Sequence, residues 1–140
     1  MKPRTRLDRV VELRERAEDD ALSRFASARS IAHDARERFA RAVEATREDS
    51  RCAGPVELWQ LDELTHRRAL QVARAAENEA LKATLGEAAA RDGYVAAHQD
   101  KVVVQRAQAR KRAEILSEVD RRERRAADEM ATLRFNFGKS

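Results

Sequence analysis

The sequence predicts an all-α protein, a long antiparallel two-helix coiled-coil hairpin in which the C-terminal helix is the longer one. Of the 140 residues, 39% are charged and only 4% are aromatic, too few large apolar side chains for a compact globular core. Apolar residues nevertheless recur at steps of three and four, which places them on one helical face and argues against intrinsic disorder. The one clear break is Gly54-Pro55, so we expect a single coiled-coil domain over residues 1–140.

The first predicted helix covers about residues 5–48. Thr5 and Asp8 fit a capping box, in which the hydroxyl and the carboxylate each accept a hydrogen bond from a free backbone N–H. Arg14 interrupts the apolar seam and is expected to lay its aliphatic stem along it. The many alanines of the seam predict closely spaced helix axes. The seam consists of Leu7, Val10, Val11, Ala17, Ala21, Phe25, Ala28, Ala32, Ala35, Phe39 and Ala42.

The predicted turn covers about residues 49–55. It contains the only cysteine, Cys52, so no intramolecular disulfide can form. Gly-Pro cannot continue a helix, but Pro55 suits the first position of the next one, and Glu57 complements its N-terminus. A short connection between two long helices normally makes them antiparallel neighbours. No base is visible that would activate Cys52, which we interpret as a turn residue.

The second predicted helix covers about residues 56–136. Asp92-Gly93 could form a turn, which would give a three-helix bundle instead, and Gly86 is a second interior glycine. The apolar pattern continues through both glycines, which favours one continuous helix. The residues expected to form its seam are Ala88, Arg91, Val95, Val102, Ala109, Arg112 and Leu116.

The second helix is too long to be covered by the first. If the chain turns near Cys52, Thr5 lies opposite about residue 99, and residues 100–137 project as an unpaired helix about 57 Å long. This stretch carries a further apolar seam, interrupted only by Glu123, and residues 101–140 contain 11 Lys and Arg against 6 Asp and Glu. An uncovered apolar seam implies a partner. The seam consists of Leu116, Val119, Ala126, Met130, Leu133 and Phe137.

The start of the second helix carries a short apolar cluster of Leu58, Trp59, Leu61 and Leu64. Leu58 and Leu61 are expected to face the first helix near Phe39 and Val43. Trp59 points elsewhere, so it either contacts a partner or covers the end of the hairpin.

The sequence contains no pattern that indicates catalysis, a cofactor or a metal. His33, His66 and His98 are too far apart, and no Cys or His stands at ligand spacing from them. Gly138-Lys139-Ser140 resembles the end of a phosphate-binding loop, but Leu133 stands where that loop needs glycine. We therefore expect no enzyme and no cofactor.

The basic clusters around Arg110 and Arg121 suit an acidic protein surface or a nucleic acid, and an ordinary solvated helix face explains them equally well. Interleaved acidic residues and few stacking aromatics argue against nucleic acid. No apolar run approaches the length of a membrane span, and the N-terminus lacks the features of a secretory signal. The expected location is the cytoplasm.

Two segments resemble the flagellar export protein family FliJ. Residues 6–21 (RLDRVVELRERAEDDA) are similar to the family's N-terminal pattern RL-x-RV-x-x-LRE-x-x-E-x-x-A. Residues 111–131 are similar to its basic C-terminal helix, with Arg121-Arg122-Glu123-Arg124-Arg125 followed by Asp-Glu. The resemblance implies a two-helix coiled coil similar to the γ stalk of rotary ATP synthases. Type III secretion stalk proteins share these features, so an injectisome homologue and a self-associating structural coiled coil stay open as alternatives.

The resemblance also implies partners. In this family the chain-terminal end inserts into the hexameric export ATPase and promotes its assembly, and the hairpin region meets the cytoplasmic domain of the export gate. Export chaperones are further partners, and the expected place of work is the cytoplasmic face of the inner membrane, without insertion into it. The implied ATPase-binding residues are Leu7, Val10, Val11, Arg112, Leu116, Val119, Arg121, Arg122, Arg125, Met130, Leu133 and Phe137. The implied gate-binding residues are Phe39, Val43, Leu58, Trp59 and Leu61.

Overall fold

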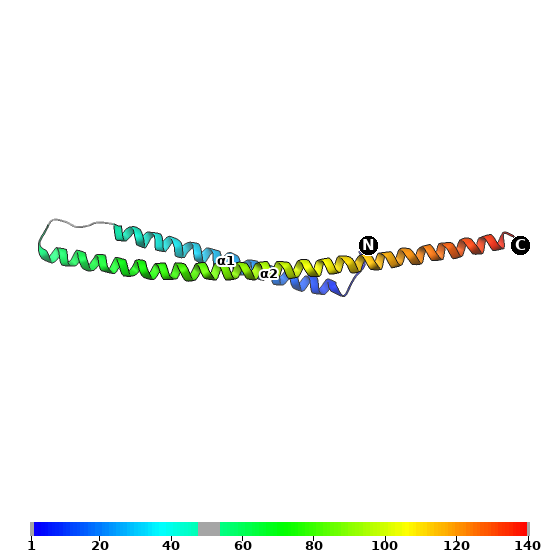
Figure 1. The fold of residues 1–140 in the computed structure, drawn as a ribbon, viewed down its shortest axis with the longest axis horizontal. Helices are drawn as coiled ribbons and strands as arrows, with labels where there is room; N and C mark the ends of the chain where they lie inside the picture. The colour runs from blue at the N-terminus through cyan, green and yellow to red at the C-terminus, as the bar shows by residue number, and fades with distance from the viewer. Residues whose placement is uncertain (1, 48–53, 140) are drawn as a thin grey trace. The chain divides into compact units, whose positions relative to one another are not determined.

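The computed structural model describes residues 2–47 and 54–139. They form two helices, α1 (Leu7–Arg47) and α2 (Val56–Phe137), of 41 and 82 residues (Figure 1). No strand occurs among these described residues, and the predicted all-α hairpin with the longer C-terminal helix is confirmed. The predicted turn residues 49–53, Cys52 among them, lie outside the described residues.

The N-terminus of α1 is capped by its own acidic residue. The Asp8 carboxylate accepts a hydrogen bond from the Thr5 backbone N–H at 3.1 Å, as a capping box requires. The Thr5 hydroxyl, however, donates to the same carboxylate at 2.7 Å instead of accepting from the backbone. Only the carboxylate half of the predicted box is therefore present.

α2 is continuous through both interior glycines, so the alternative three-helix bundle broken at Asp92-Gly93 is not formed. The Leu58 backbone N–H donates to the Pro55 carbonyl at 3.0 Å, which places Pro55 at the start of the helix, where proline is tolerated. At the other end, the Gly138 N–H donates to the Arg134 carbonyl at 3.0 Å. Glu57 lies in the first turn, where an acidic residue complements the helix dipole.

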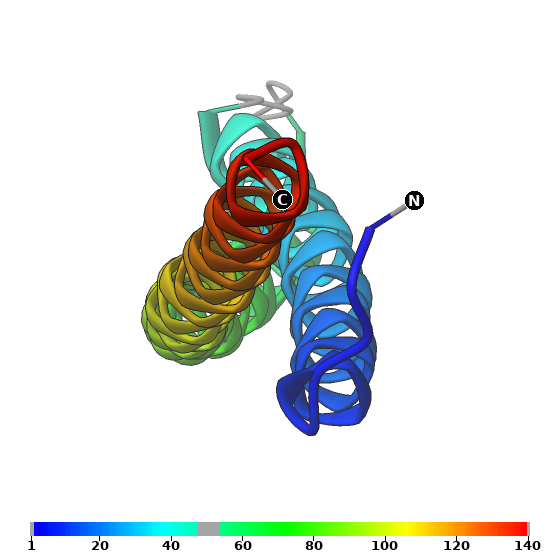
Figure 2. The same ribbon diagram turned by 90° about the vertical axis from the view of Figure 1, so that its right-hand side faces the viewer.

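The contacts between the helices divide the chain into two units, Asp19–Ala96 and Met1–Glu18 with Ala97–Ser140. In the first unit, α1 (cyan) and α2 (green) lie side by side in Figure 1 and Figure 2. Phe25 stacks on Tyr94 with ring centroids 6.3 Å apart, and the Arg36 guanidinium lies 3.0 Å from the Glu87 carboxylate. Because the residue numbers rise on α1 as they fall on α2, the packing is antiparallel.

Small side chains form the seam of this unit. Ala32 and Ala35 are buried on α1 and Ala73 and Ala80 on α2, and Ala32 has no exposed surface at all. Among the described residues no large side chain is fully buried. Alanines at the seam allow the two backbones to approach each other, so the packing here rests on many small contacts. Other half-buried alanines of α2 continue the pattern every seven residues: Ala69, Ala76, Ala83 and Ala90.

The seam of α2 lies one residue away from the predicted one. Glu87 and Tyr94 face α1, whereas Ala88, Arg91 and Val95 are exposed. In the other unit the shift is only partial: Lys101 and Gln108 are half-buried and Ala109 is exposed, but Val102 and Arg112 are half-buried as predicted. On α1, Ala17 is likewise exposed and Glu18 takes its place. The prediction was wrong because α2 carries two periodic stripes side by side, and the more apolar one is not the one that meets α1.

The register of the hairpin also differs from the prediction. Since Phe25 lies against Tyr94 and Arg36 against Glu87, the end of α1 at Arg47 lies opposite about residue 75 of α2. α2 therefore begins well before its pairing with α1, and the chain does not fold symmetrically about Cys52.

In the unit Met1–Glu18 with Ala97–Ser140, the N-terminus consequently reaches farther along α2 than predicted. Asp8 contacts Gln108 and Arg112, beyond the predicted position near residue 99. Half-buried residues continue to Ile115, and residues 116–139 are all exposed. The unpaired helix starts at Leu116, not at residue 100.

Candidate protein-binding surfaces

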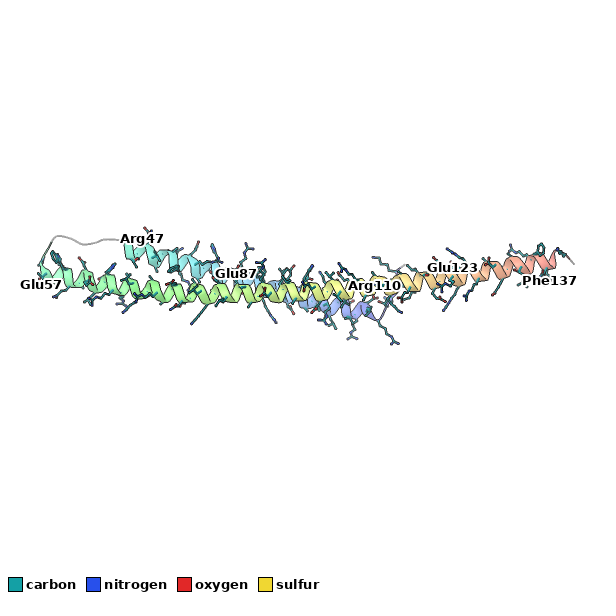
Figure 3. All side chains as sticks on the ribbon, viewed as in Figure 1. Arg47, Glu57, Glu87, Arg110, Glu123 and Phe137 are labelled. Carbon is teal, nitrogen blue, oxygen red and sulfur yellow. The ribbon has the colours of Figure 1, made fainter. Side chains whose placement is uncertain are left out.

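The first candidate surface is the C-terminal segment, residues 116–139. In this segment α2 has no other part of the described chain packed on it, and its side chains project on all sides around Glu123 and Phe137 (Figure 3). Leu116 is 51% exposed and Phe137 78%. Val119, Met130 and Leu133 are also exposed, as the sequence predicts. Together with Ala126 these residues form one stripe, which we call the C-terminal stripe.

The arginines at 121, 124 and 125 do not lie on the stripe, whereas Arg134 projects in the same direction as Leu116. At about 100° per residue, Arg121, Arg124 and Arg125 project roughly 120° or more away from the centre of the stripe, while Arg122 lies at its flank. Arg121 and Arg122 pair with Glu118 on the same helix, at 3.8 Å and 3.1 Å. Arg124 and Arg125 form no ion pair among the described residues. The helix thus presents an apolar face, and on the opposite side three arginines with Asp128 among them.

The other residues expected to bind the ATPase lie where α1 contacts α2. Val11 is only 7% exposed and Leu7 is half-buried, while Val10 is exposed. Arg112 donates a hydrogen bond to the Asp8 carboxylate at 3.2 Å. These residues and the C-terminal stripe therefore do not form one continuous surface. The Val11 side chain is packed in the seam between α1 and α2 and is not exposed to solvent.

Around Arg112 the seam is polar. The Asp8 carboxylate accepts hydrogen bonds from Thr5 and from the Gln108 amide, the latter at 2.7 Å, and these bonds, with the nearby Arg112 charge, lower the Asp8 pKa from 3.8 to about 2. One atom of this cluster, Arg112 Nε, is buried without a hydrogen-bond partner.

A second charged cluster surrounds Glu18. Lys101 Nζ lies 2.8 Å from the Glu18 carboxylate and His98 Nδ1 lies 3.2 Å from it. The hydrogen bond from Lys101 is the main reason that the pKa of Glu18 is lowered. Sequence reasoning missed both clusters. The available signal was the recurrence of Lys101 and Gln108 seven and fourteen residues after Tyr94, on the side of α2 that meets α1.

The second candidate surface is the α2-start cluster, Val56, Leu58, Trp59, Leu61 and Leu64. All five side chains are exposed, and Trp59 is 60% exposed. A shallow depression lies beside them, lined by Val56, Trp59, Gln60, Glu63, Leu64 and Arg67.

The prediction that Leu58 and Leu61 face Phe39 and Val43 is wrong. The register puts Phe39 opposite about residue 80 of α2, so the two pairs do not meet. Phe39 and Val43 are half-buried against α2, whereas Leu58 and Leu61 are exposed. The five implied gate-binding residues therefore form two separate groups.

The described part of the chain contains no group of His, Cys, Asp and Glu side chains able to hold a metal ion. His33 lies 3.3 Å from Glu37 on the next turn, and His98 contacts Glu18. Among the described helices, none is long and apolar enough to cross a membrane.

Comparison with known proteins finds one family. The family model of the flagellar FliJ protein matches residues 1–140, the whole chain. No curated protein and no solved structure matches the sequence.

Proposed function

The chain belongs to the flagellar FliJ family of export-related proteins, and we propose that it is a non-enzymatic stalk of the flagellar type III export apparatus. In this role its C-terminal segment inserts into the ring of the hexameric export ATPase and promotes ring assembly and ATP hydrolysis. The protein also couples the ATPase to the export gate and handles export chaperones at the cytoplasmic face of the inner membrane.

The observation that carries this proposal is the C-terminal stripe. Six apolar positions from Leu116 to Phe137 are displayed on a helix that no described part of the chain covers. Apolar surface of this extent is costly to leave in water, and it commonly marks a protein interface. A lone helix is also marginally stable by itself, so a partner would stabilise it.

The opposite placement of the arginines supports a partner that surrounds the helix. A partner with one groove would contact the stripe and leave Arg121, Arg124 and Arg125 in solvent. A ring that encloses the helix would contact both faces, the stripe through apolar residues and the arginines through acidic ones. The central opening of a hexameric ATPase has that geometry.

The α2-start cluster is the proposed contact to the export gate. Trp59 combines a large apolar ring with a hydrogen-bond donor, and exposed Trp residues are frequent interaction hot spots. Leu58 and Leu61 are exposed beside it, whereas Phe39 and Val43 are half-buried and would support the helix pair instead of touching the gate.

The test is ATP hydrolysis by the cognate export ATPase with and without the protein. We expect stimulation by the native chain and its loss in the double variant Leu116→Asp with Leu133→Asp, because two carboxylates would have to be buried in the apolar contact. The matched control is Gln71→Asp with Ala88→Asp, which adds the same charge at the same spacing at two exposed positions of α2 outside the C-terminal segment. Loss of stimulation in the first variant alone would support the stripe assignment. Equal stimulation by both variants would refute it, and no stimulation by the native chain would refute the stalk function.

A further inference from the structure

Polar and charged groups make most of the contacts between the first turns of α1 and α2, beside the one buried apolar side chain of Val11. The Asp8 carboxylate accepts hydrogen bonds from the Gln108 amide at 2.7 Å and from the Arg112 guanidinium at 3.2 Å. Both partners come from α2, about one hundred residues away in the sequence. Asp8 and Arg112 each keep about 30% of their side-chain surface exposed, so water reaches this contact.

The same chemistry recurs two and three turns farther along α1. The Glu18 carboxylate lies 2.8 Å from Lys101 Nζ and 3.2 Å from His98 Nδ1, and both partners belong to α2. Between these two clusters, the Arg14 guanidinium lies 3.4 Å from the Asp100 carboxylate, and both side chains are about half exposed. In the described part of this unit, three residues of α1 form ion pairs with α2: Asp8 and Glu18 through their carboxylates, and Arg14 through its guanidinium.

Apolar burial in this contact is small. Val11, which is 7% exposed, is the one buried apolar residue among the described residues of this unit, whereas the unit Asp19–Ala96 buries Ala32, Ala35, Ala73 and Ala80 and stacks Phe25 on Tyr94. Partly exposed ion pairs are individually weak and are screened by salt. The unsatisfied Arg112 Nε weakens the contact further, because a buried donor without a partner is unfavourable.

We propose that residues 7–18 of α1 form an electrostatic clamp on residues 97–115 of α2, and that this clamp opens reversibly while the unit Asp19–Ala96 stays folded. Segments held by few apolar contacts and by solvent-exposed polar ones open at lower free energy than the rest of a fold. Opening uncovers Val104 and Ile115 and separates Lys101 and Arg112 from their carboxylates. The uncovered seam is continuous with the C-terminal segment, so the clamp sets how much of α2 is available to a partner.

Asp8 and Glu18 also indicate the chemistry of that partner. Their carboxylates hold cations of α2 at hydrogen-bond distance, so an acidic helix could take the place of the clamp by forming the same pairs. This inference does not depend on the proposed export function, because the clamp opens in the isolated protein.

The test is hydrogen exchange of the intact protein at about 0.02 M and 0.5 M NaCl, which changes the Debye length from roughly 20 Å to roughly 4 Å. We expect exchange of the amides of residues 11–18 to accelerate about tenfold or more at high salt, and that of residues 28–45 to change less than about twofold. Equal acceleration in both segments would overturn the proposal, because the chain would then open as one unit. Salt-independent exchange of residues 11–18 would overturn it too, because packing would then hold the clamp.

A pair of variants separates the clamp from general charge effects. Lys101→Gln with Arg112→Gln removes its cations on α2 and leaves the Thr5–Asp8 cap of α1 unchanged. Arg106→Gln with Arg110→Gln makes the same charge change at two exposed positions of α2. We expect fast exchange of residues 11–18 at low salt in the first variant only. The same rates in both variants would contradict the clamp.

Discussion

Replacing the two interior glycines of α2 by alanine should stabilise the protein. Gly86 and Gly93 both lie inside the continuous helix, where glycine is about 1 kcal/mol less favourable than alanine. A Cβ atom built at either position meets nothing within 4 Å, and no described glycine has a positive φ. The new methyl groups therefore encounter neither a steric clash nor a backbone conformation that alanine would avoid.

The expected gain for Gly86→Ala with Gly93→Ala is about 2 kcal/mol in the free energy of unfolding. The two positions are seven residues apart, about 10 Å along the helix, so their effects should nearly add. Part of the gain arises in the unfolded state, whose backbone entropy falls when glycine is replaced. For a chain of this length, about 2 kcal/mol corresponds to an increase in Tm of roughly 6–8 °C.

The assay is urea unfolding followed by circular dichroism, with Ala89→Gly as the matched control. Ala89 is exposed on the same helix between the two glycines, and its replacement should lower the free energy of unfolding by about 1 kcal/mol. A double variant no more stable than the native chain would refute the reasoning, because α2 would then not be a regular helix at these glycines in solution. A gain in the double variant with no loss in Ala89→Gly would show that helix propensity is not the cause.

Two further predictions concern single side chains. Because the folded-state pKa of Asp8 is depressed to about 2, its contribution to stability should be fully present above about pH 4 and should be lost as the pH falls from about 4 to 2. An NMR titration of Asp8 in the intact protein checks this, and a midpoint near 3.8 would contradict the hydrogen bonds from Thr5 and Gln108. Trp59→Ala should weaken binding to the cytoplasmic domain of the export gate by about tenfold or more. The urea midpoint should not change, since Trp59 is 60% exposed. Isothermal titration calorimetry measures the affinity, with Gln60→Ala as the control, and an unchanged affinity would exclude Trp59 from the contact.

The periodicity of the sequence was sufficient to predict two helices and the seam of α1. From Ala21 to Ala42 the predicted stripe of α1 is apolar throughout, and Phe25, Ala28, Ala32 and Ala35 lie on it in the structure as predicted. Continuity of α2 followed from the pattern that runs through Gly86 and Gly93, because a turn would have shifted the phase of the apolar residues. The exposed C-terminal stripe followed from the difference in length between the two helices.

The seam of α2 and the register could not be derived in the same way. α2 carries one periodic stripe through Glu87 and Tyr94 and another through Ala88 and Val95, and their apolar content does not say which one meets α1. The choice is made by complementary pairs, the ring of Phe25 against Tyr94 and the charge of Arg36 against Glu87. These pairs also set the register between the two helices. Their partners are far apart in the sequence, so the spacing of residues along either helix does not reveal which ones pair.

The two stripes of α2 bear on how the proposed stalk and the proposed clamp relate. Gln108 and Ile115 belong to the stripe that faces α1, whereas Ala109 and Leu116 belong to the next one, about 100° around the helix. The C-terminal stripe continues the second of these through Met130 and Phe137, with Glu123 as the one polar member at that heptad position. The other members of the C-terminal stripe, Val119, Ala126 and Leu133, follow Arg112 at steps of seven residues, and Arg112 contacts Asp8 of α1. The stripe lies beyond Ile115, the last half-buried residue of α2, so a partner can bind it while the clamp is closed. Only a partner that extends past Ile115 toward Lys101 would compete with Asp8 and Glu18. ATPase stimulation that persists at the same level in Lys101→Gln with Arg112→Gln would accordingly place the ATPase contact beyond Ile115, whereas a change in that variant would mean that the clamp controls access to it.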